Sequence, residues 1–219
     1  MANLAKELSV VLPKSWFERA GNAFFNSLSM IDADGSVMGV YRKTHILIAI
    51  GYHEKQYFSP GDTGFKVWDT HYAKVGIGIC WDQWLPETAR CMALQGAEIL
   101  MYPTAIGSEP GDESAMDSMQ HWQNVMCGHA GANIMPVIAS NRIGTEKATT
   151  NDMEMTFYGS SFISDAFGNR VETADRATQS IITHSFDLAE IKLYQKTWGV
   201  YCDRRPDQYS AITTLDGKV

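Results

Sequence analysis

The stretch VGIGICWDQWLPETAR, residues 75–90, most constrains what this chain can fold into. Branched apolar residues alternate with glycines from Val75 to Ile79, and this period of two predicts a β-strand with side chains on one face only. The alternation places the thiol of Cys80 on the bare face, where a substrate can approach it. Pro86 then opens a helical pattern that Gly96 closes. We therefore expect a strand, a turn that carries a thiol, and a helix.

A thiol at such a turn has two interpretations. Folds of the α/β class place nucleophiles at strand-to-helix turns, because backbone N–H groups there can bind a developing oxyanion. A cysteine at this place can also be a small buried apolar side chain. The other cysteines, Cys91, Cys127 and Cys202, form no Cys-x-x-Cys pair, which argues against a structural zinc site and a redox dithiol.

Composition limits the class of protein and its partners. A chain of 219 residues, 45% hydrophobic and 20% charged, can bury the core of one domain, and we expect a single domain over residues 1–219. The formal net charge of -7 argues against nucleic acid or an anionic membrane as a partner, because both bind clustered Lys and Arg. No apolar run approaches the ~18 residues of a membrane span, and residues 1–8 lack the apolar region of a signal peptide. We expect a cytoplasmic protein.

The periodicity of the whole chain predicts an α/β fold with parallel and antiparallel pairings. Expected strands cover 10–13, 22–31, 37–41, 66–68, 75–79, 98–102, 136–140, 159–164 and 180–186, and expected helices cover 1–8, 86–95, 117–133 and 187–196. The two strands that flank helix 86–95 form a βαβ unit, which implies a parallel pair. Residues 46–65 and the polar segment 141–155 are expected loops.

Three residues able to support catalysis lie at strand ends or in the loop between them: Lys43, Glu54 and Cys80. Acyl transfer through a thiol needs a base to form the thiolate, a cation or N–H donors for the oxyanion, and an acid for the leaving amine. Lys43 could stabilise the oxyanion. Spacing alone leads no further, because any chain of this size has lysines and glutamates in loops.

Several motifs, matched in order, resemble the nitrilase superfamily of carbon-nitrogen hydrolases. They are Tyr41-Arg-Lys-Thr-His45, Glu54-x-x-Tyr-Phe-x-Pro-Gly-Asp62, Gly78-Ile-Cys-Trp-Asp-x-Trp-x-Pro-Glu-x-Ala-Arg90, Gly96-Ala-Glu-Ile99 and His129-Ala-x-Ala-Asn133. The resemblance is strongest to the branch that hydrolyses N-carbamoylputrescine, through Asn22 and the segments 102–110, 139–144 and 198–206. Together these matches span essentially the whole chain.

The resemblance implies an αββα sandwich and a Glu-Lys-Cys catalytic triad that needs no metal or organic cofactor. By matching motifs, Cys80 takes the place of the nucleophile and Lys43 that of the lysine. Glu54 matches a second glutamate near both. Lys43 and the backbone N–H of Trp81 would hold the oxyanion. Family members are generally homo-oligomers, and we expect the same here.

The triad glutamate of the family stands upstream of the helix whose end Met1–Leu8 resembles, and this sequence has nothing there. Glu7 and Glu18 cannot replace it, because both fall in segments that family members carry in addition to the catalytic glutamate. The resemblance therefore implies a domain without its first strand-helix-strand segment. A general base typically contributes ~10² to 10⁴ in rate, so we expect a chain that begins at Met1 to be nearly inactive.

The expected substrate is a small ureide or amide with a cationic amine. Relatives that hydrolyse N-carbamoyl amino acids carry an arginine just after the nucleophile to clamp a carboxylate, whereas this chain has Trp81, Asp82 and Gln83. Glu109 either accepts the distal ammonium or is a solvated loop residue. The segment 46–50 is apolar where the relatives carry a polar loop with Pro and Gly.

Two alternatives to a ureide hydrolase stay open at this point. The first is another amidase or nitrilase of the superfamily with a different substrate. The second is a non-catalytic remnant that acts through subunit contacts.

Overall fold

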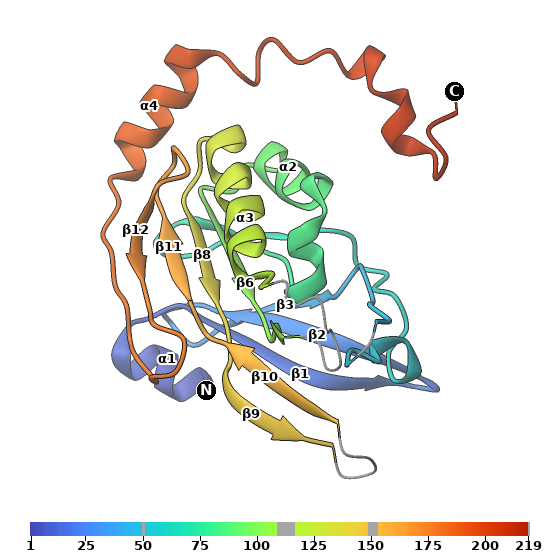
Figure 1. Ribbon diagram of the computed structural model, residues 1–219. Coiled ribbons are helices and arrows are strands. Elements are labelled where there is room, and N and C mark those ends of the chain that lie inside the picture. The colour runs from blue at the N-terminus through green and yellow to red at the C-terminus, as the bar shows by residue number, and fades with distance from the viewer. Residues whose placement is uncertain (50, 109–116, 149–152, 219) are drawn as a thin grey trace. The chain divides into compact units, whose positions relative to one another are not determined.

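The computed structural model describes residues 1–49, 51–108, 117–148 and 153–218 and divides the chain into two compact units (Figure 1). The larger unit, Met1–Ser185, holds every strand of the described chain. The smaller unit, Phe186–Val219, begins with a helix. The expectation of one domain over residues 1–219 stays a prediction.

An antiparallel sheet of three strands opens the larger unit. Helix α1 (Ala2–Leu8) precedes strands β1 (Leu12–Ala20), β2 (Ala23–Ile31) and β3 (Val37–Arg42), in the order β1-β2-β3. The expected hairpin at 32–35 is confirmed: the Gly35 amide donates to the Asp32 carbonyl at 2.9 Å, and Gly35 has φ 88°. The strand expected at 10–13 is longer than predicted. It passes through Pro13, which β1 tolerates because it is an edge strand of this sheet.

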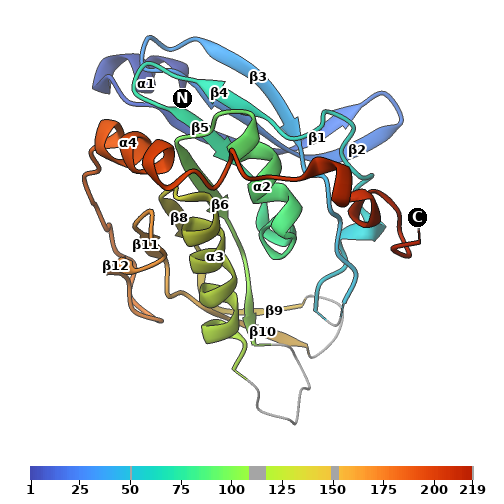
Figure 2. The same cartoon turned by 90° about the horizontal axis from the view of Figure 1, so that it is seen from above.

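The second sheet has six strands and carries the predicted βαβ unit. Its order is β12-β11-β8-β6-β5-β4, with β4 Val67–Asp69, β5 Lys74–Ile77, β6 Ile99–Pro103, β8 Val137–Ser140, β11 Phe162–Ser164 and β12 Arg170–Thr173. Strands β5, β6 and β8 are parallel neighbours, which confirms the predicted pairing. Helices α2 (Pro86–Leu94) and α3 (Met119–Asn133) lie side by side along this sheet (Figures 1 and 2). The core between them contains Met92, Leu100, Tyr102, Trp122 and Phe162, all fully buried.

Two predictions, one of a loop and one of a strand, were wrong. The expected loop 141–155 contains strand β9 (Ile143–Lys147) and the start of β10 (Glu154–Tyr158). Strand β10 pairs with β9 on one side and with β7 (Gly107–Ser108) on the other. Both faces of β9 are largely solvated, so it lacks the apolar alternation that marks a strand. The expected strand 180–186 is irregular, with Ile181 93% exposed, and β12 instead pairs with β11. An apolar run makes a strand only where a neighbour can bond its backbone.

The expected loop 46–65 and the last helix are confirmed. Outside residue 50, which the structure does not describe, the loop contains only a short 3-10 turn, η1 (Glu54–Gln56), and one isolated bridge between Ala49 and Tyr52. In the smaller unit, Asp187 caps α4 (Leu188–Trp198) by accepting hydrogen bonds from the amides of Ala189 and Glu190. The 3-10 turns η3 (Pro206–Gln208) and η4 (Ser210–Thr213) follow. Among the residues described, no helix has the length and apolar character to cross a bilayer.

The face of the stretch 75–79 that carries Gly76 and Gly78 is not bare. A Cβ at Gly76 would lie 2.8 Å from Sδ of Met92, and one at Gly78 would lie 2.9 Å from the Tyr102 ring. The glycines therefore let helix α2 and strand β6 pack closely against β5. The expectation of a face open to substrate was wrong, because this face belongs to the core.

Replacing Gly78 with alanine is expected to destabilise the fold by about 1 to 3 kcal/mol, because the added methyl meets the buried Tyr102 ring and the side chains of Asp82 and Thr88. Gly128 is the matched control, since it lies on an exposed position of α3 with nothing within 4 Å of an added Cβ. Gly128→Ala should stabilise by about 0.5 to 1 kcal/mol through helix propensity. Urea unfolding measures both, and equal effects would contradict the packing described here.

Candidate active site

Cys80 lies at the turn that the sequence predicts. Strand β5 ends at Ile77, a 3-10 turn, η2, covers Cys80–Trp84, and α2 follows at Pro86. Cys80 has φ 46°, in the left-handed region that side chains other than glycine rarely occupy. Such strain persists where the surrounding structure fixes it, and it is typical of sharp turns that present a nucleophile.

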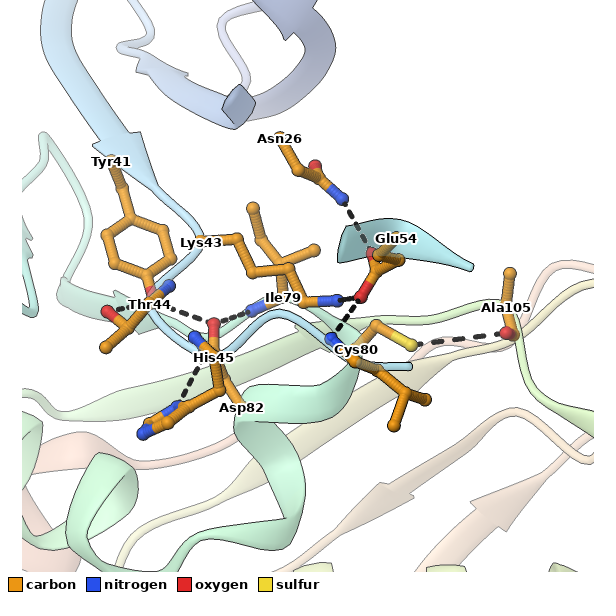
Figure 3. A network of polar contacts seen from close by, with 11 residues as sticks. Asn26, Tyr41, Lys43, Thr44, His45, Glu54, Ile79, Cys80, Asp82 and Ala105 are labelled. Atoms are coloured by element: carbon orange, nitrogen blue, oxygen red, sulfur yellow. Dashed lines mark hydrogen bonds and ion pairs between the residues drawn. The ribbon is translucent and has the colours of Figure 1, made fainter. Parts of the chain in front are cut away.

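Lys43 and Glu54 form an ion pair beside this turn (Figure 3). Lys43 follows β3 directly, its side chain is fully buried, and its ammonium donates to Oε2 of Glu54. Glu54 comes from η1 and also accepts from the Leu47 amide at 3.2 Å and from Nδ2 of Asn26 at 3.4 Å. A buried ammonium is costly unless it is paired, and Glu54 is the counter-ion of Lys43 in the site.

The thiol of Cys80 is half-buried and close to both charges. Its Sγ lies 4.0 Å from the carbonyl oxygen of Ala105, in the loop after β6. Burial raises the pKa of this thiol, and the positive charge of Lys43 opposes the rise. The thiol is therefore protonated at neutral pH, and a nucleophilic thiolate requires a base.

Asp82 joins the segment that carries Lys43 to the turn that carries Cys80. Its side chain is fully buried and accepts hydrogen bonds from the hydroxyl of Tyr41 (2.7 Å) and the amide of Ile79 (2.9 Å). It also accepts from the amide (3.0 Å) and Nδ1 (2.8 Å) of His45. Burial and the nearby Asp82 raise the pKa of Tyr41, so its hydroxyl stays a donor. The sequence analysis missed this role, although Asp82 stands inside one matched motif, and Tyr41 and His45 stand inside another.

The other predicted residues have different outcomes. The Trp81 amide lies in the first turn of η2, where N–H groups have no helical acceptor and can bind an oxyanion. Its role stays a prediction. Glu109 lies outside the described residues. Glu18 accepts from Arg42 (Nη2 to Oε1, 2.7 Å) and from Ser27, and the Arg42 bond lowers its pKa, so this carboxylate is already engaged elsewhere.

Two cavities open at Cys80. The larger is a cleft of about 960 Å³ whose wall includes Asn26, Glu54, Thr104 and the hairpin β9-β10. The smaller, of about 340 Å³, shares Cys80 with it. In the part of the chain described, no cluster of His, Cys, Asp and Glu could hold a metal ion. The geometry thus offers a thiol, a paired lysine and room for a small organic substrate.

Comparison with known proteins identifies this arrangement. The carbon-nitrogen hydrolase family model matches residues 1–196. The chain belongs to the carbon-nitrogen hydrolase family. It is 58% identical to an N-carbamoylputrescine amidase of Solanum lycopersicum, over 99% of this chain and 73% of that protein. It is 60% identical to a citrullinase of Francisella tularensis, over 95% of this chain and 72% of that one.

A solved structure confirms the predicted fold class. The carbon-nitrogen hydrolase of Helicobacter pylori G27 superposes with a TM-score of 0.92 at 41% identity, over 98% of this chain and 74% of that one. The α/β fold of the nitrilase type is therefore established. The chain is also established as a carbon-nitrogen hydrolase of the amidohydrolase class. The catalytic roles of Cys80, Lys43 and Glu54 stay predictions that the geometry makes specific.

Replacing Asp82 with asparagine is expected to destabilise the protein by about 3 kcal/mol, because an amide group would face donors that now point at a carboxylate. The control Tyr41→Phe removes one donor and leaves the carboxylate with the others, for an expected cost of about 1 kcal/mol. Thermal unfolding with calorimetry measures both. A smaller loss for D82N than for Y41F would contradict the role given to Asp82.

Alkylation of Cys80 by iodoacetamide should have a pH midpoint above that of a free cysteine thiol, because burial raises its pKa. Lys43→Met should move the midpoint further up, since it removes the charge that opposes the rise. Mass spectrometry of the Cys80 peptide follows the reaction. Alkylation of the exposed Cys202 in the same sample is the internal control for the activity of the reagent. A midpoint that falls in the Lys43 variant would refute this electrostatic assignment.

Proposed function

We propose that this protein hydrolyses a C–N bond of a linear ureide, with N-carbamoylputrescine as the foremost substrate. The observation that carries the proposal is the Cys80 thiol beside the Lys43–Glu54 ion pair, where Cys80 and Glu54 line a cleft large enough for a small ureide. Relatives named N-carbamoylputrescine amidase, 55% to 58% identical, support it. The products would be putrescine, carbon dioxide and ammonia.

The reaction follows from the groups in the site. The Cys80 thiolate attacks the ureido carbon, and Lys43 with the Trp81 amide stabilises the negative oxygen of the tetrahedral intermediate. The bond to the substituted nitrogen breaks, and putrescine leaves with the proton that the base took from the thiol. Water then cleaves carbamoyl-Cys80 to the thiol and carbamic acid, which decomposes to carbon dioxide and ammonia. The resemblance gives the role of base to a glutamate that this sequence does not contain.

Citrulline is the second candidate substrate. The citrullinase of Francisella tularensis is as similar to this chain as the putrescine-type relatives are. Citrulline carries the same terminal ureido group, so the chemistry at Cys80 would be unchanged. The two substrates differ only at the far end, where citrulline has an α-amino acid and N-carbamoylputrescine has a primary amine.

A cytoplasmic homo-oligomer that serves polyamine synthesis is the setting we propose for this reaction. Putrescine as a product supports the pathway, and the family resemblance supports the assembly. An uncharged or cationic small molecule fits the acidic net charge of -7.

Replacing Cys80 with serine should reduce ammonia release from N-carbamoylputrescine by at least about 10³, because the nucleophile is lost. Glu54→Gln should lower kcat by about 10², since Lys43 loses its counter-ion. Cys202→Ser is the matched control and should retain the full rate. The assay uses the protein with any residues that its gene encodes before Met1. Turnover by Cys80→Ser at the rate of the unchanged protein would refute the mechanism.

A further inference from the structure

The smaller cavity beside Cys80 has an almost wholly apolar wall. Leu47, Ala49, Tyr52, Trp81, Trp84 and His121 line it. Leu47 and Ala49 belong to the segment that the sequence analysis identified as apolar. These two residues place aliphatic side chains on the same wall as the thiol of Cys80. We refer to this cavity as the aromatic pocket.

Aromatic rings dominate the pocket. The Trp81 and Trp84 rings have centroids 6.1 Å apart, and the Trp84 and His121 rings meet edge to face at 5.0 Å. Indole faces attract cations through their quadrupole, most strongly where water is excluded. The hydroxyl of Ser118 also lines the pocket and is buried without a hydrogen-bond partner in the described structure, so it can accept a bond from an ammonium.

The charges around the two cavities favour the aromatic pocket as the site for a cationic arm. No Asp, Glu, Lys or Arg is among its described lining residues, so a carboxylate would lose its water there and gain no cation. The larger cleft does have acidic residues on the β9-β10 hairpin. However, Glu146 is paired with Arg142 and Glu154 with Lys147, so both carboxylates already have counter-ions.

We propose that the aromatic pocket binds the alkylamine arm of the substrate, with methylenes against Leu47 and the ammonium over the indole rings. This inference rests on the proposed function and extends it to specificity. It predicts that the protein prefers ureides with an unbranched ω-amino chain. Ureides that carry a carboxylate at the far end, citrulline included, bind less well because no Lys or Arg is among the described residues that line the pocket.

Ala49→Arg tests the proposal, because it puts a guanidinium at the wall of the aromatic pocket. It should raise KM for N-carbamoylputrescine about tenfold and lower KM for N-carbamoyl-4-aminobutyrate, which replaces the ammonium with a carboxylate. Ala148→Arg is the matched control, since Ala148 is also exposed and lines the larger cleft but not the aromatic pocket. It should leave the ratio of kcat/KM for the two ureides unchanged.

Binding of the amine products separates this proposal from the proposed function, because it needs no turnover. Tryptophan fluorescence titrations with putrescine and 4-aminobutyrate should show tighter binding of putrescine, with the order reversed in Ala49→Arg. If no ureide is hydrolysed while this order holds, the proposed function fails and the pocket assignment stands. Tighter binding of 4-aminobutyrate by the unchanged protein, or an equal response in Ala148→Arg, would overturn the assignment.

Discussion

The buried carboxylate of Asp82 is the interaction on which the candidate site depends. It accepts hydrogen bonds from Tyr41 and His45 on either side of Lys43, and from Ile79 next to Cys80. Lys43 and Cys80 follow strands of different sheets, β3 and β5, and are far apart in sequence, so no local backbone geometry relates them. The hydrogen bonds that Asp82 accepts from both segments hold Lys43 and Cys80 in position relative to each other, because leaving any of those donors unpaired inside the protein is costly.

The Lys43–Glu54 ion pair places a positive and a negative charge beside the Cys80 thiol. Lys43 has no exposed surface, and Glu54 supplies the charge that keeps its ammonium in place. The thiol beside them is protonated at rest because burial raises its pKa. The site therefore holds a cation ready for a developing oxyanion while the nucleophile stays in its neutral form until a base acts. That combination suits acyl transfer from a poorly reactive ureide better than attack on an already activated carbonyl.

The sequence predicted the parts of this structure that local periodicity controls. The βαβ unit around helix 86–94 followed from alternation and from Pro86, and the turn at Cys80 followed from the same pattern. The β9-β10 hairpin could not be predicted, since β9 has no apolar face. The glycines at 76 and 78 were assigned to an open face because periodicity does not show which helix covers a sheet.

The site was predictable only through matched motifs. These motifs placed Lys43, Glu54 and Cys80 together, whereas spacing alone left them as ordinary loop residues. Asp82 was missed because its partners lie about forty positions upstream, as the separations of 41 and 37 residues to Tyr41 and His45 show. Long-range hydrogen bonds leave no local pattern in a sequence. The aromatic pocket was hidden for the same reason, since its lining residues come together only after folding, among them Leu47, Ala49, Trp81, Trp84, Ser118 and His121.

The most direct test of this account is to trap the covalent intermediate. The protein is mixed with N-carbamoylputrescine, quenched in acid within milliseconds to seconds, and digested for mass spectrometry. The account predicts that the peptide with Cys80 gains the mass of one carbamoyl group, and that Cys91, Cys127 and Cys202 remain unmodified. Release of putrescine with the Cys80 peptide unmodified at every quench time, and with undiminished turnover in Cys80→Ala, would contradict it.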